Sequence, residues 1–218
     1  MFDSKPTDAP AIHVWTREGE SSDDFDRYLI HLSQSDSVLD LGCGEGHFLR
    51  ALKQRGIRAR GVDLNEALAV GLAAQGLDVI QADVLDALRG LDERFSVVSM
   101  LDFAEHIPLD TLLAILREAA RIPGTKLLLQ TPNLDSVIGM KFYFHLPSHV
   151  TPLHPFFLRK ILDQHGFTIL DEWSDYGGLP WTGFRGWITR KILNGIFGPP
   201  VAHMFEGGGN ICIVASAR

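Results

Sequence analysis

Short apolar segments alternate with amphipathic segments along the middle of the chain, and this alternation restricts the fold more than any other feature. Each apolar segment has the length of a strand, and each amphipathic segment repeats its apolar residues at helical spacing. Because consecutive parallel strands need a crossover, which is usually a helix, the pattern predicts a doubly wound α/β fold with helices on both faces of a mostly parallel sheet. The expected strands are 37–42, 58–64, 78–84, 95–103 and 125–132, and the expected helices between them are 47–56, 66–76 and 109–122.

The pattern changes in the C-terminal part of the chain. A helix is expected at 155–166 and a strand at 167–174, and residues 210–218 read as a last strand that no helix joins directly to the one before it. These two strands are therefore expected to form an antiparallel pair. The stretch 175–210 between them is rich in Gly, Pro and aromatic residues, and its length is typical of a functional insert or lid.

The composition fits one folded domain behind a short arm. Residues 1–20 lack periodicity and read as an N-terminal arm, whereas 21–218 have enough apolar residues for a single core in a chain that is 45% hydrophobic. The net charge of −7 argues against a broad electrostatic grip on nucleic acid. The chain has two cysteines, no basic and apolar leader, and no run of about 18 apolar residues, so we expect a soluble protein of the reducing cytoplasm without a membrane span.

The stretch VLDLGCGEGHF, residues 38–48, places three glycines between an expected strand and an expected helix. Such a loop presents backbone N–H groups and a positive helix end to a ligand. In the nicotinamide fingerprint a small residue stands at the sixth position, where this chain has the bulky His47. Asp40, two residues before Gly42, would repel a phosphate but suits an ammonium or sulfonium group. A nicotinamide-binding oxidoreductase is therefore the weaker interpretation.

Two further acidic residues follow the next two expected strands. Asp63 lies 19 residues after Gly44, where it can accept hydrogen bonds from two ribose hydroxyls. Asp83 could accept from an adenine amine, with Val84 against the ring. A strand-end Asp is also a common helix N-cap, which is the ordinary alternative for both.

Taken in order, VLDLGCGEG, GVDL, QADV and FSVVSMLDFAEHI resemble the successive motifs of class I S-adenosylmethionine-dependent methyltransferases, over roughly 37–173 plus the last strand. The resemblance implies a seven-stranded Rossmann-like sheet with an antiparallel last strand, and S-adenosylmethionine as cofactor. It implies that Asp40 faces the methionine amino group, that Asp63 holds the ribose and that Asp83 holds the adenine. The expected cofactor-binding residues are Asp40, Gly42, Cys43, Gly44, Asp63, Leu64, Asp83, Val84 and Leu101.

Asp102, Glu105 and His106 form a D-x-x-E-H pattern after the fourth expected strand. It resembles the E-x-x-E-H of ubiquinone-biosynthesis O-methyltransferases and of small-RNA 3′-end 2′-O-methyltransferases, which implies a divalent cation held by these three residues and His149. Such a cation would lower the pKa of a hydroxyl group about to be methylated. Without a metal, His106 or His149 would be the catalytic base, Glu105 would orient it, and Asp102 would only brace the loop.

The segment FHLPSHVTPLHP supplies three histidines, His145, His149 and His154, of which His149 is the expected site residue. It resembles the H-x-x-x-x-x-P segment of small-molecule and glycan methyltransferases. His154 precedes Pro155, so the alternative is that it caps the following helix. The expected reaction is an in-line attack by a substrate oxygen on the sulfonium methyl group.

The expected insert contains an apolar stripe at helical spacing with basic residues beside it, within 181–200. This stripe favours a small-molecule or lipid-linked hydroxyl acceptor, while packing onto the domain, a dimer contact or peripheral membrane contact are alternatives. An RNA acceptor is disfavoured by the acidic balance. A non-catalytic cofactor-binding scaffold would not be expected to keep Glu105, His106 and His149. The stripe consists of Phe184, Trp187, Ile188, Ile192 and Ile196, and the basic residues are Arg185, Arg190 and Lys191.

Overall fold

The computed structural model describes residues 25–91, 94–175, 191–192, 195, 204 and 207–218. The predicted N-terminal arm at 1–20 lies outside the described residues, as does almost all of the predicted insert. The division into an arm, a domain and a lid therefore stays a prediction.

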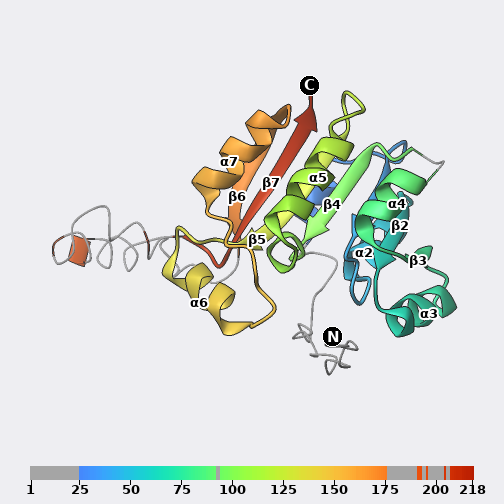
Figure 1. Ribbon diagram of the computed structural model, residues 1–218, viewed down its shortest axis with the longest axis horizontal. Helices are drawn as coiled ribbons and strands as arrows, with labels where there is room; N and C mark the ends of the chain where they lie inside the picture. Colours follow the sequence, from blue (N-terminus) through green and yellow to red (C-terminus); the bar gives the residue numbers. More distant parts are fainter. Residues whose placement is uncertain (1–24, 92–93, 176–190, 193–194, 196–203, 205–206) are drawn as a thin grey trace, which may run out of the picture.

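The described part of the chain forms one seven-stranded sheet in the order β3-β2-β1-β4-β5-β7-β6 (Figure 1). The first five strands are parallel, and β7 runs antiparallel between β5 and β6. This confirms the predicted mostly parallel sheet with an antiparallel last strand. The strands are β1 Ser37–Leu41, β2 Arg58–Asp63, β3 Val79–Gln81, β4 Val97–Leu101, β5 Lys126–Pro132, β6 Phe167–Asp175 and β7 Asn210–Ala217.

Helices cover both faces of the sheet, because alternate side chains of the central strands enter two different cores. Leu39 of β1 packs with residues of α4, α5 and α7, whereas its neighbour Val38 packs with residues of α1 and α2. Figure 1 shows α4, α5 and α7 together on the near face. The doubly wound arrangement is confirmed. The helices are α1 Asp26–Leu29, α2 His47–Gln54, α3 Glu66–Ala74, α4 Val84–Gly90, the 3₁₀ turn η2 Ala104–His106, α5 Leu109–Ala119, α6 Val137–His145 and α7 Pro155–Gln164.

The third strand ends earlier than its apolar pattern predicts. Asp83 ends the extended segment, because its carboxylate accepts hydrogen bonds from the backbone N–H groups of Leu85 at 2.8 Å and Asp86 at 3.2 Å. This is an N-cap, and it starts helix α4 at Val84. The prediction of a strand reaching residue 84 is therefore wrong at its C-terminal end.

Helix α6 was not predicted. Its residues 137–145 are apolar all round rather than along one stripe, so the helical period is hard to see. Ser136 caps it by accepting a hydrogen bond from the N–H of Gly139 at 2.9 Å. The helix lies at the end of the sheet where β4 and β5 end (Figure 1). Among the described residues, no helix combines the length and apolar content needed to cross a bilayer.

Candidate active site

The glycine loop after β1 is built around two close contacts. Gly42 has φ +69°, and a Cβ there would lie 2.1 Å from the ring of Phe103. Gly46 has φ +74°, and its Cβ would lie 2.9 Å from Leu72 of α3. In the nicotinamide fingerprint, the small residue that packs closely stands at the sixth position counted from the first glycine. In this chain the close packing is made one residue earlier, by Gly46. These contacts and the left-handed backbone restrict both positions to glycine and fix the path of the loop.

Asp40 is buried beneath this loop, with 4% of its surface exposed. Its Oδ1 accepts a hydrogen bond of 2.7 Å from the hydroxyl of Ser99, which stands opposite it on β4. Burial raises the pKa of Asp40 to about 7, the Ser99 hydrogen bond opposes this shift, and the nearby charge of Asp63 adds to it. A cationic group close to Asp40 would stabilise its ionised form. Ser99 was not foreseen, although a lone polar residue in the apolar strand VVSML is a usable signal.

Asp63 holds the loop in position from the end of β2. One of its carboxylate oxygens accepts from the N–H of Gly44 at 3.0 Å, and the other accepts from the N–H of Asn65 at 2.8 Å. Leu64 beside it is 68% exposed. The bracing of Gly44 was not predicted, and the expected contact between Asp63 and a ribose stays a prediction.

The remaining cofactor-binding candidates differ in exposure. Cys43 is buried against Leu49 and Leu72, and burial raises the pKa of its thiol, so its side chain is not a nucleophile at neutral pH. Asp83 caps α4, which is the alternative considered for it, and Val84 is buried in that helix. Leu101 ends β4 and is partly buried. The adenine contacts of Asp83 and Val84 stay predictions.

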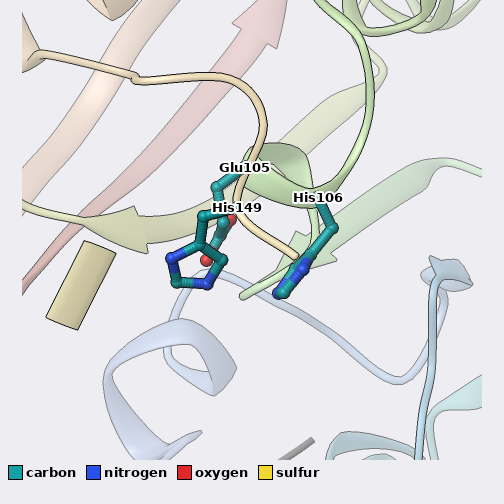
Figure 2. Close-up of side chains that lie close together, drawn as sticks. All are labelled: Glu105, His106 and His149. Atoms are coloured by element: carbon teal, nitrogen blue, oxygen red, sulfur yellow. The ribbon is translucent and has the colours of Figure 1, made fainter. Parts of the chain in front are cut away.

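Three catalytic candidates come together at the carboxyl end of β4. Glu105 and His106 belong to η2, and His149 lies between α6 and α7 (Figure 2). One potential ligand atom from each side chain lies within 4.8 Å of the others. Glu105 is 1% exposed, and the two imidazole rings meet edge to face with centroids 4.6 Å apart. The fold thus unites residues that are more than 40 positions apart in the chain.

Backbone hydrogen bonds fasten the His149 segment to the η2 turn. The carbonyl oxygen of Glu105 accepts from the N–H groups of Val150 at 2.9 Å and Thr151 at 3.1 Å. The hydroxyl of Thr151 donates to the carbonyl oxygen of Ile107 at 2.6 Å. These contacts set the distance between His149 and His106, and we call residues 148–151 the strap.

The protonation of both histidines follows from their surroundings. Nδ1 of His149 lies 2.7 Å from the carbonyl oxygen of Tyr143, which can only accept, so Nδ1 carries the proton and Nε2 has a free lone pair. Burial lowers the pKa of His149 against the opposing effects of Tyr143 and Asp102. Burial, reinforced by His149, lowers the pKa of His106 to about 4 against a hydrogen bond to the Ser148 backbone. Both rings are therefore neutral at pH 7 and can bind a cation, although a pKa of about 4 makes His106 a weak proton acceptor.

Asp102 does not belong to this three-residue cluster. Its backbone is left-handed, with φ 52°, which is unusual for a residue other than glycine. Its carboxylate accepts hydrogen bonds from Gln130 of β5 at 2.8 Å and from Asn210 of β7 at 3.2 Å. The structure thus supports the loop-bracing alternative and leaves Asp102 out of the predicted metal-binding set.

The other two histidines of the same segment lie outside the cluster. Nδ1 of His154 accepts from the N–H of Phe156 at 3.1 Å, so His154 caps α7 as its alternative interpretation predicted. His145 ends α6. Tyr143, which sets the tautomer of His149, was missed because α6 itself was missed.

Comparisons with known proteins identify the family of the chain. Residues 16–172 match the family described as "Methyltransferase domain". The chain is 30% identical over 170 residues to a ubiquinone biosynthesis O-methyltransferase of Coxiella burnetii (strain RSA 331 / Henzerling II), covering 72% of this chain and 69% of that protein. It is also 30% identical to one of Pseudomonas aeruginosa (strain UCBPP-PA14), with 79% and 80% coverage. A solved S-adenosylmethionine-dependent methyltransferase from Archaeoglobus fulgidus superposes with a TM-score of 0.69 at 24% identity, covering 89% of this chain and 92% of that one.

Proposed function

Because the chain belongs to the methyltransferase-domain family and is a class I S-adenosylmethionine-dependent methyltransferase, we propose that it methylates a hydroxyl oxygen of a small-molecule or lipid-linked acceptor. The observation that carries the choice of oxygen is the cluster of Glu105, His106 and His149 at the end of β4, in which Nε2 of His149 is available to a hydroxyl proton. Relatives named as ubiquinone biosynthesis O-methyltransferases support the same choice.

The reaction needs one bond to form and one to break. The acceptor oxygen attacks the methyl carbon, the bond between that carbon and sulfur breaks, and its electron pair stays on the sulfur of S-adenosylhomocysteine. The hydroxyl proton passes to an imidazole, for which Nε2 of His149 is the candidate, since Nδ1 is already protonated toward Tyr143. The sulfonium is a good leaving group, so most of the acceleration comes from alignment of the two reacting atoms.

On this proposal, the cofactor lies across the ends of β1, β2 and β3. The ammonium group of its methionine part would face the loop above Asp40, and its ribose would meet Asp63. Leu64 exposes an apolar side chain at the same edge, where it would pack against the adenine. This arrangement directs the sulfonium toward η2, because the ends of β1 and β4 are adjacent in the sheet.

An apolar acceptor is supported by the surface near the cluster. Helix α6 exposes 39% of Phe142 and 78% of Phe144, and the strap exposes 57% of Val150. Large apolar side chains grouped beside an active site favour a hydrophobic ligand or peripheral contact with a membrane surface. A lipid-linked acceptor could then be reached without leaving its membrane.

A divalent cation is a second element of the proposal. The donor set contains two imidazoles and one carboxylate, which suits Mn²⁺, Fe²⁺, Co²⁺ or Zn²⁺ better than Mg²⁺. Glu105, His106 and His149 would hold the ion, and it would lower the pKa of an acceptor hydroxyl. The dependence of activity on a chelator, followed by readdition of Mn²⁺ or Mg²⁺, tests this element separately from methyl transfer.

The proposal is tested by transfer of labelled methyl groups from S-adenosylmethionine to catechols with and without a prenyl tail. We expect O-methylated product, with a lower KM for the prenylated catechol. A matched amine series is the control, since N-methylation in the absence of O-methylation would contradict the proposal. No transfer to either series, despite binding of S-adenosylhomocysteine, would also contradict the proposed acceptor class.

A further inference from the structure

A buried series of hydrogen bonds leads from the first helix to the turn that carries Glu105 and His106. The hydroxyl of Tyr28 in α1 lies 3.1 Å from Oε1 of Gln130 in β5, and Nε2 of Gln130 lies 2.8 Å from Oδ2 of Asp102. Tyr28 is 1% exposed and Gln130 is 5% exposed. We call Tyr28, Gln130 and Asp102 the brace.

The direction of each hydrogen bond in the brace follows from the acid at its end. A carboxylate can only accept, so the Gln130 amide turns its Nε2 toward Asp102 and its Oε1 toward Tyr28. The Tyr28 hydroxyl then donates, and it keeps its proton at neutral pH because burial raises its pKa well above the ordinary value. The buried thiol of Cys212 in β7 donates to the same Oε1 at 3.5 Å. Gln130 therefore has a single favourable amide orientation.

Gln130 holds Asp102 at two points. In addition to the side-chain contact, the carbonyl oxygen of Gln130 accepts from the N–H of Asp102 at 3.0 Å. Asn210 of β7 donates to the other carboxylate oxygen at 3.2 Å. Asp102 depends on this support because its φ of 52° is left-handed, which a residue other than glycine keeps only where its surroundings hold it there. Strained backbone of this kind is concentrated at functional sites.

The left-handed residue directs the chain from β4 into η2. Phe103 follows Asp102 directly and precedes η2, and its carbonyl oxygen accepts from the N–H of His106 at 3.0 Å. The positions of Glu105 and His106 therefore depend on the backbone conformation at Asp102. A change in the brace would reach both side chains without altering either of them.

The cofactor loop has support of its own. The ring of Phe103 touches Gly42, but the N–H groups of Gly42 and Cys43 donate to the carbonyl oxygen of Val62 in β2 at 2.8 and 3.1 Å. These contacts do not involve the brace. A small shift at Asp102 should therefore affect η2 more than the loop.

From these contacts we propose that Tyr28 and Gln130 are positioning residues for methyl transfer. Through Asp102 they hold the turn that places η2 opposite His149. The inference rests on the proposed role of the cluster in methyl transfer, and it adds two residues that do not belong to the cluster but set its geometry.

Two substitutions break the brace at different points. Gln130→Leu removes the contacts of the amide, so kcat should fall about 30-fold, and Tyr28→Phe removes one hydroxyl, so kcat should fall about fivefold. In both variants the affinity for S-adenosylhomocysteine should stay within about twofold of the original value. Unchanged kcat in Gln130→Leu, or an equal loss of kcat and affinity, overturns the proposal.

Trp173→Phe is the matched control for a purely structural effect. The Trp173 ring packs on the Tyr28 ring, with centroids 4.8 Å apart, and takes no part in the hydrogen bonds of the brace. The substitution should lower the melting temperature by loosening this packing and leave kcat within about twofold of the original value. A fall in kcat as large as that of Tyr28→Phe overturns the proposal, because loosened packing alone would then explain both.

An exchange of donor and acceptor tests the pairing of Gln130 with Asp102. In Gln130→Glu two acids face each other, and kcat should fall about tenfold at pH 8. Addition of Asp102→Asn restores each hydrogen bond, because the new amide can donate to the new carboxylate while its oxygen still accepts from Asn210. We expect kcat of the double variant to recover to within about threefold of the original value. No recovery overturns the proposal.

Histidine NMR of the protein without acceptor separates this inference from the proposed function. Spectra of His106→Gln and His149→Gln assign the two ring signals. We expect Gln130→Leu and Tyr28→Phe to shift the His106 signal and Trp173→Phe to leave it unchanged. If these shifts occur but the original chain transfers no methyl group to a hydroxyl, the proposed function fails while the positioning of η2 stands. An unshifted His106 signal in Gln130→Leu overturns the inference.

Discussion

The two halves of the candidate active site are held together by different means. In the cofactor half, the loop after β1 and the carboxylates of Asp40 and Asp63 sit at the ends of neighbouring parallel strands. In the catalytic half, the η2 turn meets the strap, which follows a helix far along the chain, and they are joined by a few hydrogen bonds. The first half depends on backbone shape and buried charge, and the second on contacts between separate segments. The two halves should therefore respond differently to substitution.

The largest effect is expected from Gly42→Ala in the cofactor half. A Cβ there would overlap the ring of Phe103, and the left-handed backbone disfavours alanine, so we expect a loss of about 2–4 kcal/mol in the free energy of unfolding. Binding of S-adenosylhomocysteine should fall about 100-fold as the loop shifts. Denaturant unfolding and calorimetry measure the two effects.

Gly71→Ala is the matched control, because a Cβ at this position in α3 meets nothing within 4 Å. It should leave cofactor affinity unchanged and stabilise the helix slightly. If Gly42→Ala behaves like Gly71→Ala, the conformation of the loop does not depend on the close contact between Gly42 and Phe103.

Glu105→Gln is expected to affect the catalytic half alone. The change keeps the shape of the side chain but removes the charge beside His106 and His149, so kcat should fall about 100-fold. Affinity for S-adenosylhomocysteine should stay within about twofold of the original value, since no loop contact is altered. Single-turnover kinetics and calorimetry separate these results. An equal loss in kcat and in affinity for S-adenosylhomocysteine would mean that the two halves of the site are not independent.

The pH dependence of cofactor binding should report Asp40. Because burial raises its pKa to about 7, Asp40 is mostly protonated at pH 6 and mostly ionised at pH 8. We expect S-adenosylhomocysteine, through its ammonium group, to bind about tenfold more tightly at pH 8 than at pH 6. His106, with a pKa of about 4, stays neutral across this window and contributes no change. Asp40→Asn should flatten the dependence.

Asp40 also affects how the stability of the ligand-free protein changes with pH. Between the ordinary value of 3.8 and about 7, folded Asp40 keeps a proton that the unfolded chain has lost, so its effect on stability becomes more unfavourable as pH rises. Ser99→Ala removes the hydrogen bond that opposes the shift and should move both dependences to higher pH. A profile identical in Ser99→Ala and the original chain would exclude Asp40 as the titrating group.

The smallest effect is expected from Thr151→Val in the strap. Loss of the hydrogen bond to Ile107 leaves the two backbone contacts to Glu105, so His149 should move only slightly. We expect kcat to fall about fivefold with unchanged cofactor affinity. Thr168→Val, on an exposed position of β6, is the control and should change neither quantity. A fall in cofactor affinity with unchanged kcat would show that the strap supports the cofactor half and not the catalytic half.

The fold of the cofactor half could be predicted because its signals are local, whereas its contacts with the cofactor stay predictions. Strand length, helical spacing and the glycine loop each lie within about ten residues, and the parallel register then places Asp40 and Asp63 at one edge. The prediction failed at Asp83, where the apolar pattern indicates a continued strand. There the carboxylate accepts hydrogen bonds from the N–H groups of Leu85 and Asp86 and starts a helix instead.

The catalytic half could be predicted only as a set of residue types. The sequence contains Glu105, His106 and His149, but their meeting depends on α6, whose apolar residues surround the helix and show no stripe. The bracing of Asp102 depends on Asn210, which is 108 positions away. Contacts at such a distance follow from the order of strands in the sheet, which local periodicity does not specify.

The place of β7 in the sheet also affects how the protein is made. Among the described strands, β6 pairs with β7 alone, and β7 is the last of the seven to leave the ribosome. Until it emerges, β5 presents an open edge and β6 has no neighbour. The hydrogen bond from Asn210 to Asp102, the residue before Phe103 and the η2 turn, is also missing. Late, long-range pairing of this kind is slow and leaves strand edges exposed to other chains. Nascent chains stalled before Asn210 should therefore depend on chaperones far more than the released protein.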